Sequence, residues 1–184
     1  MLTLNLNPFP ILHTERLTLR QITHNDTNEI FMLRSDHRVM KYVDRPMPKL
    51  PEDVTGLIQK MIDGINNNDS ISWAISLQSD PELIGMIGFW RIEKENYRAE
   101  IGYMLHPDYQ GKGIMQEAMT AVLDYGFNVM KLHSVEANVN PANEASIRLL
   151  GKNKFEKEAY FKEDFYFQGK FLDSAIYSLL TSDR

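Results

Sequence analysis

Three consecutive apolar segments constrain the fold of this chain most. They are residues 71–77, 83–92 and 97–105. The first alternates apolar and polar side chains, which is the period of a half-buried strand. Only short polar breaks, at Asp80 and Pro81 and at residues 94–96, separate the three. Strands joined by such short turns pair with their neighbours, so the segments predict an antiparallel meander.

The pattern changes after the meander. A polar loop at residues 106–112 leads into residues 113–129, whose apolar side chains recur at helical spacing. Further helices are predicted at residues 52–66 and 143–152, and further strands at residues 14–22, 134–139, 155–161 and 173–180. Strands that alternate with helices require some parallel pairing. We therefore expect an α/β (α+β) fold, with a mixed, twisted sheet of about six to seven strands and helices on both faces.

Composition excludes several classes of protein. A chain of 184 residues predicts a single domain spanning residues 1–184. The absence of cysteine excludes a cysteine nucleophile, disulfides and thiolate metal sites, and the five histidines lack metal-ligand spacing. A net charge of −5 argues against a nucleic-acid partner. We read no signal peptide and no apolar run long enough to span a membrane, so we expect a cytoplasmic protein with no membrane partner.

The loop before residues 113–129 carries the clearest chemical signal. Gly111 and Gly113 allow close approach of a ligand, and the helix that follows presents unpaired N–H groups and its positive dipole end. Lys112 adds a positive charge, so the loop is suited to a pyrophosphate. Neither the dinucleotide fingerprint nor the P-loop fits, because Gln116 replaces a glycine and Gly113 replaces a serine or threonine. A glycine turn before an ordinary helix is the alternative.

This segment resembles the acyl-CoA-binding motif Q/R-x-x-G-x-G/A of the GNAT (Gcn5-related N-acetyltransferase) family. Gln110, Gly113 and Met115 take its three defined positions, and Met115 departs from the usual glycine or alanine. Other segments resemble the family in the expected order: residues 99–103, 143–150 and Phe155, and, for the branch that acetylates the N-terminal alanine or serine of ribosomal proteins, residues 14–20 and 169–180. The resemblance implies a GNAT fold and an enzyme that transfers acetyl from acetyl-CoA to a primary amine, without a metal.

The resemblance also implies which residues bind the cosubstrate. The backbone of Met104 and Leu105 is expected at the thioester carbonyl, where the strand splays away from residues 134–139. The loop residues expected at the cosubstrate are Gln110, Gly111, Lys112, Gly113, Ile114 and Met115. Asn143 is either the cap of the next helix or a contact to the pantetheine arm.

Two residues are candidates for the chemistry. Glu100, between Ala99 and Ile101 in a strand, is the candidate base, because partial burial would raise its pKa; the alternative is an ion pair with Arg91 or Arg98. Ser146 is the candidate donor to the leaving sulfur; the alternative is a serine that bonds the carbonyl one turn back. The tyrosine that many members carry four residues later is absent, since Leu150 stands there.

The acceptor is predicted less sharply. Trp90, Tyr103 and Asp173 are the candidate acceptor-binding residues, whereas ordinary packing under a hairpin is favoured for Phe165, Tyr166 and Phe167. The expected partner is an amine, either a protein N-terminus or a small molecule such as a polyamine, amino sugar or antibiotic, and a homodimer is also considered. A non-catalytic acyl-CoA-binding module and a nucleotide-binding regulator are the competing functions.

Overall fold

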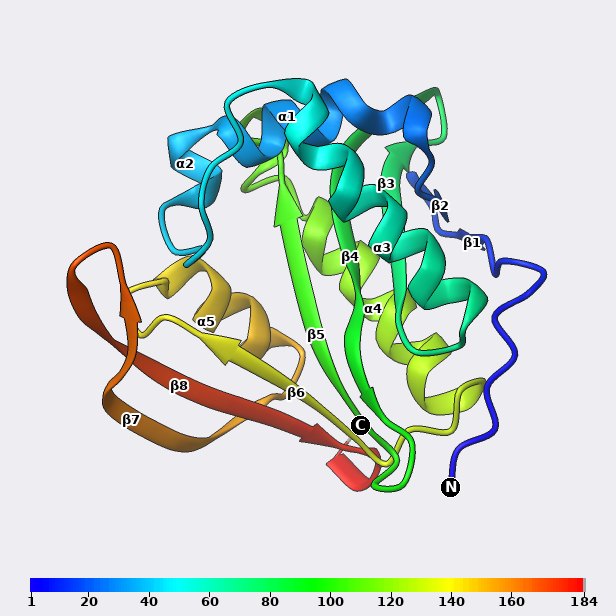
Figure 1. Ribbon diagram of the computed structural model, residues 1–184. Helices are drawn as coiled ribbons and strands as arrows, with labels where there is room; N and C mark the ends of the chain where they lie inside the picture. Colours follow the sequence, from blue (N-terminus) through cyan, green and yellow to red (C-terminus); the bar gives the residue numbers. More distant parts are fainter. Residues whose placement is uncertain (184) are drawn as a thin grey trace.

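One eight-stranded sheet runs through the computed structural model, which describes residues 1–183 (Figure 1). The strands are β1 (Leu12–His13), β2 (Leu17–Gln21), β3 (Ile71–Leu77), β4 (Asp80–Glu93), β5 (Arg98–Leu105), β6 (Ser134–Val139), β7 (Glu156–Phe167) and β8 (Lys170–Leu180). Their order is β1-β2-β3-β4-β5-β6-β8-β7, and only β5 and β6 pair in parallel. The mixed sheet is confirmed, with one strand more than expected, because the two residues of β1 are too short to show a period.

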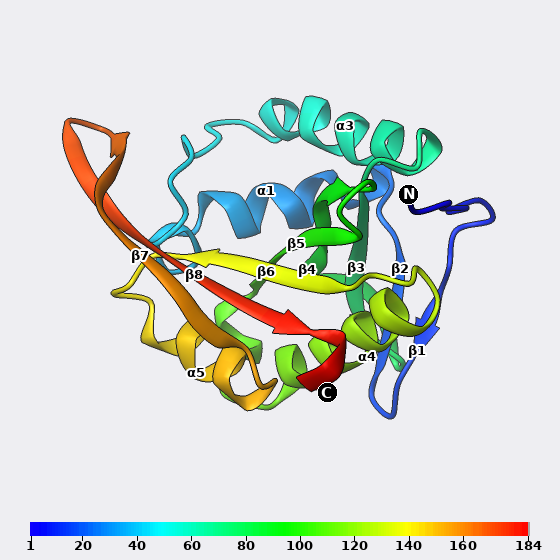
Figure 2. The ribbon, with the colours of Figure 1, turned by 90° about the horizontal axis from the view of Figure 1, so that it is seen from below.

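Helices cover both faces of the sheet, as predicted. They are α1 (Thr27–Ser35), α2 (His37–Met40), α3 (Thr55–Asn66), α4 (Ile114–Asn128) and α5 (Glu144–Lys152), with 3-10 turns at His24–Asp26, Pro51–Val54, Pro107–Tyr109 and Thr181–Asp183. Figure 2 shows α1 and α3 on one side of the strands and α4 and α5 on the other. Within residues 1–183, no helix is long and apolar enough to cross a membrane.

The meander forms as predicted, but its first turn lies elsewhere. Leu77 pairs with Asp80, so the two turn residues are Gln78 and Ser79 rather than Asp80 and Pro81. Pro81 stands inside β4, before the ladder with β5, which begins at Gly85. A proline is tolerated there because β5 does not extend alongside position 81, so no β5 carbonyl needs a backbone N–H from that residue.

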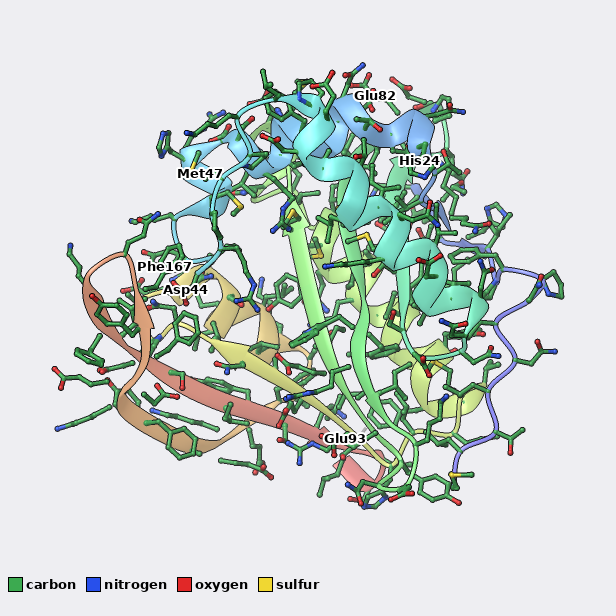
Figure 3. All side chains as sticks on the ribbon, viewed as in Figure 1. His24, Asp44, Met47, Glu82, Glu93 and Phe167 are labelled. Atoms are coloured by element: carbon green, nitrogen blue, oxygen red, sulfur yellow. The ribbon has the colours of Figure 1, made fainter. Side chains whose placement is uncertain are left out.

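The parallel pair β5–β6 separates soon after it begins. The two strands pair at only three positions: Arg98 with Ser134, Ala99 with Val135 and Glu100 with Glu136. Since β5 continues to Leu105 and β6 to Val139, their remaining residues have no partner on that side. The strands diverge as Figure 1 shows, and this confirms the predicted splay. In Figure 3, Glu93 lies near the closed end, and Asp44 and Phe167 lie toward the open side.

The last hairpin extends beyond the body of the sheet. Gln168 and Gly169 form its two-residue turn with φ of 48° and 83°, which matches the twist of the strands. β7 is an edge strand and is exposed along nearly its whole length. Phe165 and Tyr166 are exposed, so the expectation that they pack beneath the hairpin is wrong; they contact only Phe167 and Phe171 among aromatic rings of the described chain.

Candidate active site

The loop between β5 and α4 has the geometry of an anion site. Gly111 and Gly113 have φ of 72° and 76°, in the left-handed region that favours glycine. Gly113 is the N-cap of α4 and gives the helix no side-chain cap. Across residues 1–183, no acceptor is recorded for the backbone N–H groups of residues 111–116. These donors, with the positive end of the helix dipole behind them, suit a pyrophosphate.

Gln110 anchors this loop to the end of β5. Its side-chain Nε2 donates to the Leu105 carbonyl oxygen at 3.0 Å. The N–H of the next residue, His106, donates to the Ile84 carbonyl of β4. Because the N–H and C=O of a trans peptide point in opposite directions, the Leu105 carbonyl points away from β4, toward the splay. The carbonyl of Met104 has the opposite direction and lies beside Gly85 of β4. Of the two predicted backbone partners, Leu105 therefore offers its carbonyl to the open side.

The remaining loop residues differ in exposure. The side chain of Lys112 is exposed, with Nζ 5.7 Å from the centre of the Tyr109 ring. Ile114 and Met115 are buried and belong to the main apolar core. The large side chain at position 115 thus packs inward, and its backbone N–H stays among the unpaired donors.

An ion pair that sequence reasoning missed holds the loop from the other side. Arg16 Nε bonds Glu117 Oε2 at 2.6 Å, and Arg16 Nη1 donates to the Lys112 carbonyl at 3.0 Å. Thr14 Oγ1 donates to Glu117 at 2.6 Å. Burial alone would raise the pKa of Glu117, but the bonds from Thr14 and Arg16 outweigh it and lower that pKa. The resemblance of residues 14–20 to a family strand was the available signal.

Glu100 lies at the closed end of the splay, as the last paired residue of β5. Its side chain is only 11% exposed, and Oε2 is 3.8 Å from Arg91 Nη1. Burial raises its pKa, although Arg91, a hydrogen bond from Trp90 and the charge of Arg98 act against the rise. Arg98 itself pairs with Glu136. Glu100 thus has a long contact to Arg91 and a raised pKa, which suits a group that must accept a proton.

Ser146 and Asn143 start helix α5. Asn143 Oδ1 accepts the Ser146 N–H at 3.2 Å, which confirms that Asn143 caps the helix. The Ser146 hydroxyl does not bond the carbonyl one turn back; it pairs with the Tyr103 hydroxyl at 2.6 Å. Burial raises the pKa of Tyr103 to about 12. Sequence reasoning named both residues but did not connect them.

The three predicted acceptor residues do not share one pocket. Trp90 occupies a β-bulge, is 50% exposed, and lies 3.3 Å from the position of a Cβ on Gly102. Because side chains alternate along a strand, Tyr103 points to the opposite face from Gly102 and Glu100. Asp173 accepts bonds from the Tyr160 hydroxyl and the Glu163 N–H in the last hairpin, which lower its pKa.

The site therefore has two sides, with β5 between them. Glu100 and Tyr103 are three residues apart on that strand, about 10 Å along it. The candidate base faces the α1–α3 side, and the Tyr103–Ser146 pair faces α5. No cluster of histidine, aspartate or glutamate within the described residues could hold a metal ion.

A splayed mixed sheet, with a glycine loop before a helix at the end of β5, is the arrangement expected of acyl-CoA-dependent transferases. Residues 16–156 match the family model described as Acetyltransferase (GNAT) domain. The chain belongs to the GNAT family and is an acyl-CoA-dependent N-acetyltransferase.

Known relatives agree on the class and differ in substrate. The chain is 37% identical over 172 residues, 94% of this chain and 97% of the relative, to the uncharacterized N-acetyltransferase YoaA of Bacillus subtilis. It is 34% identical over 56% of its length, and 54% of the relative, to the ribosomal protein uS5-alanine N-acetyltransferase of Escherichia coli. It is 27% identical over 88% of its length, and 83% of the relative, to the spermidine N(1)-acetyltransferase of that organism.

Solved structures confirm the fold. A GNAT acetyltransferase from Bacillus anthracis aligns with a TM-score of 0.82 and 30% identity, over 93% of this chain and 98% of that one. RimL, a ribosomal L7/L12 α-N-protein acetyltransferase solved in complex with coenzyme A, aligns with a TM-score of 0.85 and 22% identity, over 95% and 100%.

Proposed function

We propose that this enzyme transfers acetyl from acetyl-CoA to a primary amine by direct attack within a ternary complex, with a protein N-terminal amino group as the favoured acceptor. The observation that carries the proposal is the β5–β6 splay, with unpaired N–H donors beyond its mouth and a buried Glu100 at its closed end. The opening strand's resemblance to acetyltransferases of protein N-termini, and the uS5-alanine relative, support this acceptor.

The cosubstrate is assigned to this splay. Residues 111–116 offer their N–H groups to the pyrophosphate, and Lys112 supplies a nearby positive charge. The unpaired edge of β5, residues 101–105, can pair with the amide groups of the pantetheine arm as another strand would. The Leu105 N–H, which points to the open side like the carbonyl of the same residue, would then lie beside the thioester carbonyl and donate to its developing negative charge.

The reaction needs one group that accepts a proton from the amine and one group that donates a hydrogen bond to the leaving sulfur. Glu100 lies five residues, roughly 17 Å along β5, from Leu105. It takes a proton from the ammonium group of the acceptor through a chain of waters. The amine lone pair then forms the C–N bond with the thioester carbon, and the C–S bond breaks with its electron pair on sulfur. Ser146 donates a hydrogen bond to that sulfur. One of the two remaining amine protons passes to solvent, the other stays on the amide nitrogen, and the thiolate leaves as CoA.

A polyamine acceptor is the second candidate, favoured by the spermidine acetyltransferase relative, which aligns over most of the chain. The deciding experiment measures thiol release from acetyl-CoA with peptides bearing free N-terminal alanine or serine, with polyamines and with aminoglycosides. The chain has no cysteine, so the thiol reagent has no background from the protein. Release with one class identifies the acceptor chemistry.

Glu100→Gln is the matched variant for this assay. We expect a loss of about 100-fold or more in kcat, the usual contribution of a general base, with acetyl-CoA affinity within twofold by calorimetry. Acetyl-CoA binding without thiol release from any acceptor would instead indicate the non-catalytic module. A failure to bind acetyl-CoA would overturn the assignment of residues 111–116.

A further inference from the structure

Tyr103 and Ser146 form a contact between β5 and α5 that the scheme above leaves unexplained. Their hydroxyl oxygens are 2.6 Å apart, although the residues are 43 positions apart in the chain. Neither hydroxyl has another recorded partner within the described residues. Both residues lie beside the splayed part of β5, beyond its last paired residue, Glu100.

The chemistry of the two groups favours one direction for this bond. A serine hydroxyl can donate once and accept twice, so it can receive the Tyr103 proton and still direct its own O–H elsewhere. The phenol of Tyr103 stays protonated throughout the physiological range, because burial raises its pKa to about 12. The Ser146 backbone is held separately, by the cap from Asn143. The serine hydroxyl is thus left with one rotatable proton.

We propose that Tyr103 is a positioning residue, whose O–H donates to Ser146 Oγ and thereby directs the serine proton toward the leaving sulfur. This inference rests on the proposed function, which places the thioester in the splay. It gives Tyr103 a role in the transfer step, on the opposite face of β5 from Trp90 and the acceptor side.

The pair stabilises the thiolate and does not protonate it. An ordinary thiol has a pKa of about 8.5. Transfer of a proton from the Tyr103 phenol, with its pKa of about 12, to such a thiolate would be unfavourable by roughly a thousandfold. A hydrogen bond from Ser146, polarised by Tyr103, needs no such transfer and still lowers the basicity of the sulfur.

The thiol pKa of bound CoA tests this directly and needs no acceptor. Because the protein has no cysteine, CoA supplies the only thiol, and its titration can be followed by thiolate absorbance. We expect the wild type to lower the pKa of bound CoA relative to free CoA. Tyr103→Phe and Ser146→Ala should each reverse most of that shift, and the double variant should add nothing to Ser146→Ala.

Kinetics with an active acceptor give the second readout. Tyr103→Phe should lower kcat about threefold to tenfold, the effect of one neutral hydrogen bond, with both KM values within twofold. The loss should disappear in the Ser146→Ala background. Tyr125→Phe changes a partly buried tyrosine on α4, away from the Tyr103–Ser146 pair. It is the matched control and should leave kcat and the thiol pKa unchanged.

Three results would overturn the proposal. They are an unchanged thiol pKa in Tyr103→Phe, an equal effect of Tyr103→Phe with and without Ser146, and a change confined to the KM of the acceptor. If CoA does not bind the wild type at all, the proposed function itself fails, and the positioning role fails with it. Melting curves of each variant separate these outcomes from a loss of folding.

Discussion

Two helical glycines should respond in opposite ways to the same substitution. In α4, a Cβ on Gly126 would lie 2.7 Å from Phe89 Cζ and 3.2 Å from Leu132 Cδ1, both in the core. In α5, a Cβ on Gly151 would meet no atom within 4 Å. Alanine improves helix propensity by up to about 1 kcal/mol at either position. Only Gly126→Ala must also displace packed side chains, at about 1–3 kcal/mol.

The difference between the two variants isolates the packing cost, since the gain in propensity cancels. We expect Gly151→Ala to raise the melting temperature by up to about 4 °C and Gly126→Ala to lower it by several degrees, at roughly 2–4 °C per kcal/mol for this chain length. Calorimetric or circular-dichroism melts at one protein concentration measure both. Equal stabilisation by the two variants would refute the packing argument between α4 and β4.

Three further changes test the site. Burial raises the pKa of Glu100, so the wild-type kcat should begin to fall with decreasing pH at a higher pH than an ordinary carboxyl would give. Glu100→Gln should abolish this acid-side fall in kcat. A pH profile unchanged by the substitution would contradict the base assignment. Glu117 has a lowered pKa, so its stabilisation is present above its unfolded-state pKa of about 4.3 and is lost as the pH falls. Glu117→Gln should therefore lower the melting temperature at pH 7, with the gap closing at acid pH; a constant gap would disprove this linkage. Gly113→Ala places a side chain at φ 76°, which costs about 1–2 kcal/mol. The substitution should therefore raise the KM for acetyl-CoA, measured from initial rates. A change in kcat alone would contradict the assignment of the loop to the cosubstrate.

Most of the fold could be predicted because long periodic segments carry it. The meander and α4 follow from residues 71–129, where period and family resemblance agree, whereas the splay was expected from the resemblance alone. β1 could not be predicted, because two residues show no period and its pairing with β2 is set by the chain around it. The first hairpin turn was misplaced because Pro81, a strong turn residue, is accommodated inside β4 where β5 does not reach.

The candidate site residues could be named from the sequence, but their contacts could not. Glu100 and the loop glycines could be proposed because the local order of strand, loop and helix determines where they lie. The Tyr103–Ser146 pair and the Arg16–Glu117 pair join segments 43 and 101 positions apart, and only the folded topology brings them together. The same alternation that predicts β5 also places Tyr103 on the other face from Glu100, although Tyr103 had been predicted to bind the acceptor that Glu100 would deprotonate.

The short pairing between β5 and β6, of only three residue pairs, also affects how long this protein survives in a cell. Because only three residue pairs join β5 to β6, the two parts of the sheet are weakly connected there. Acyl-CoA, in the proposed position, would bind across this junction and contact both parts. A ligand that binds only the folded state adds about 2.7 kcal/mol of stability at a hundredfold excess over its Kd. The abundance of the enzyme would then follow the cell's supply of activated acyl groups, with no regulatory domain required.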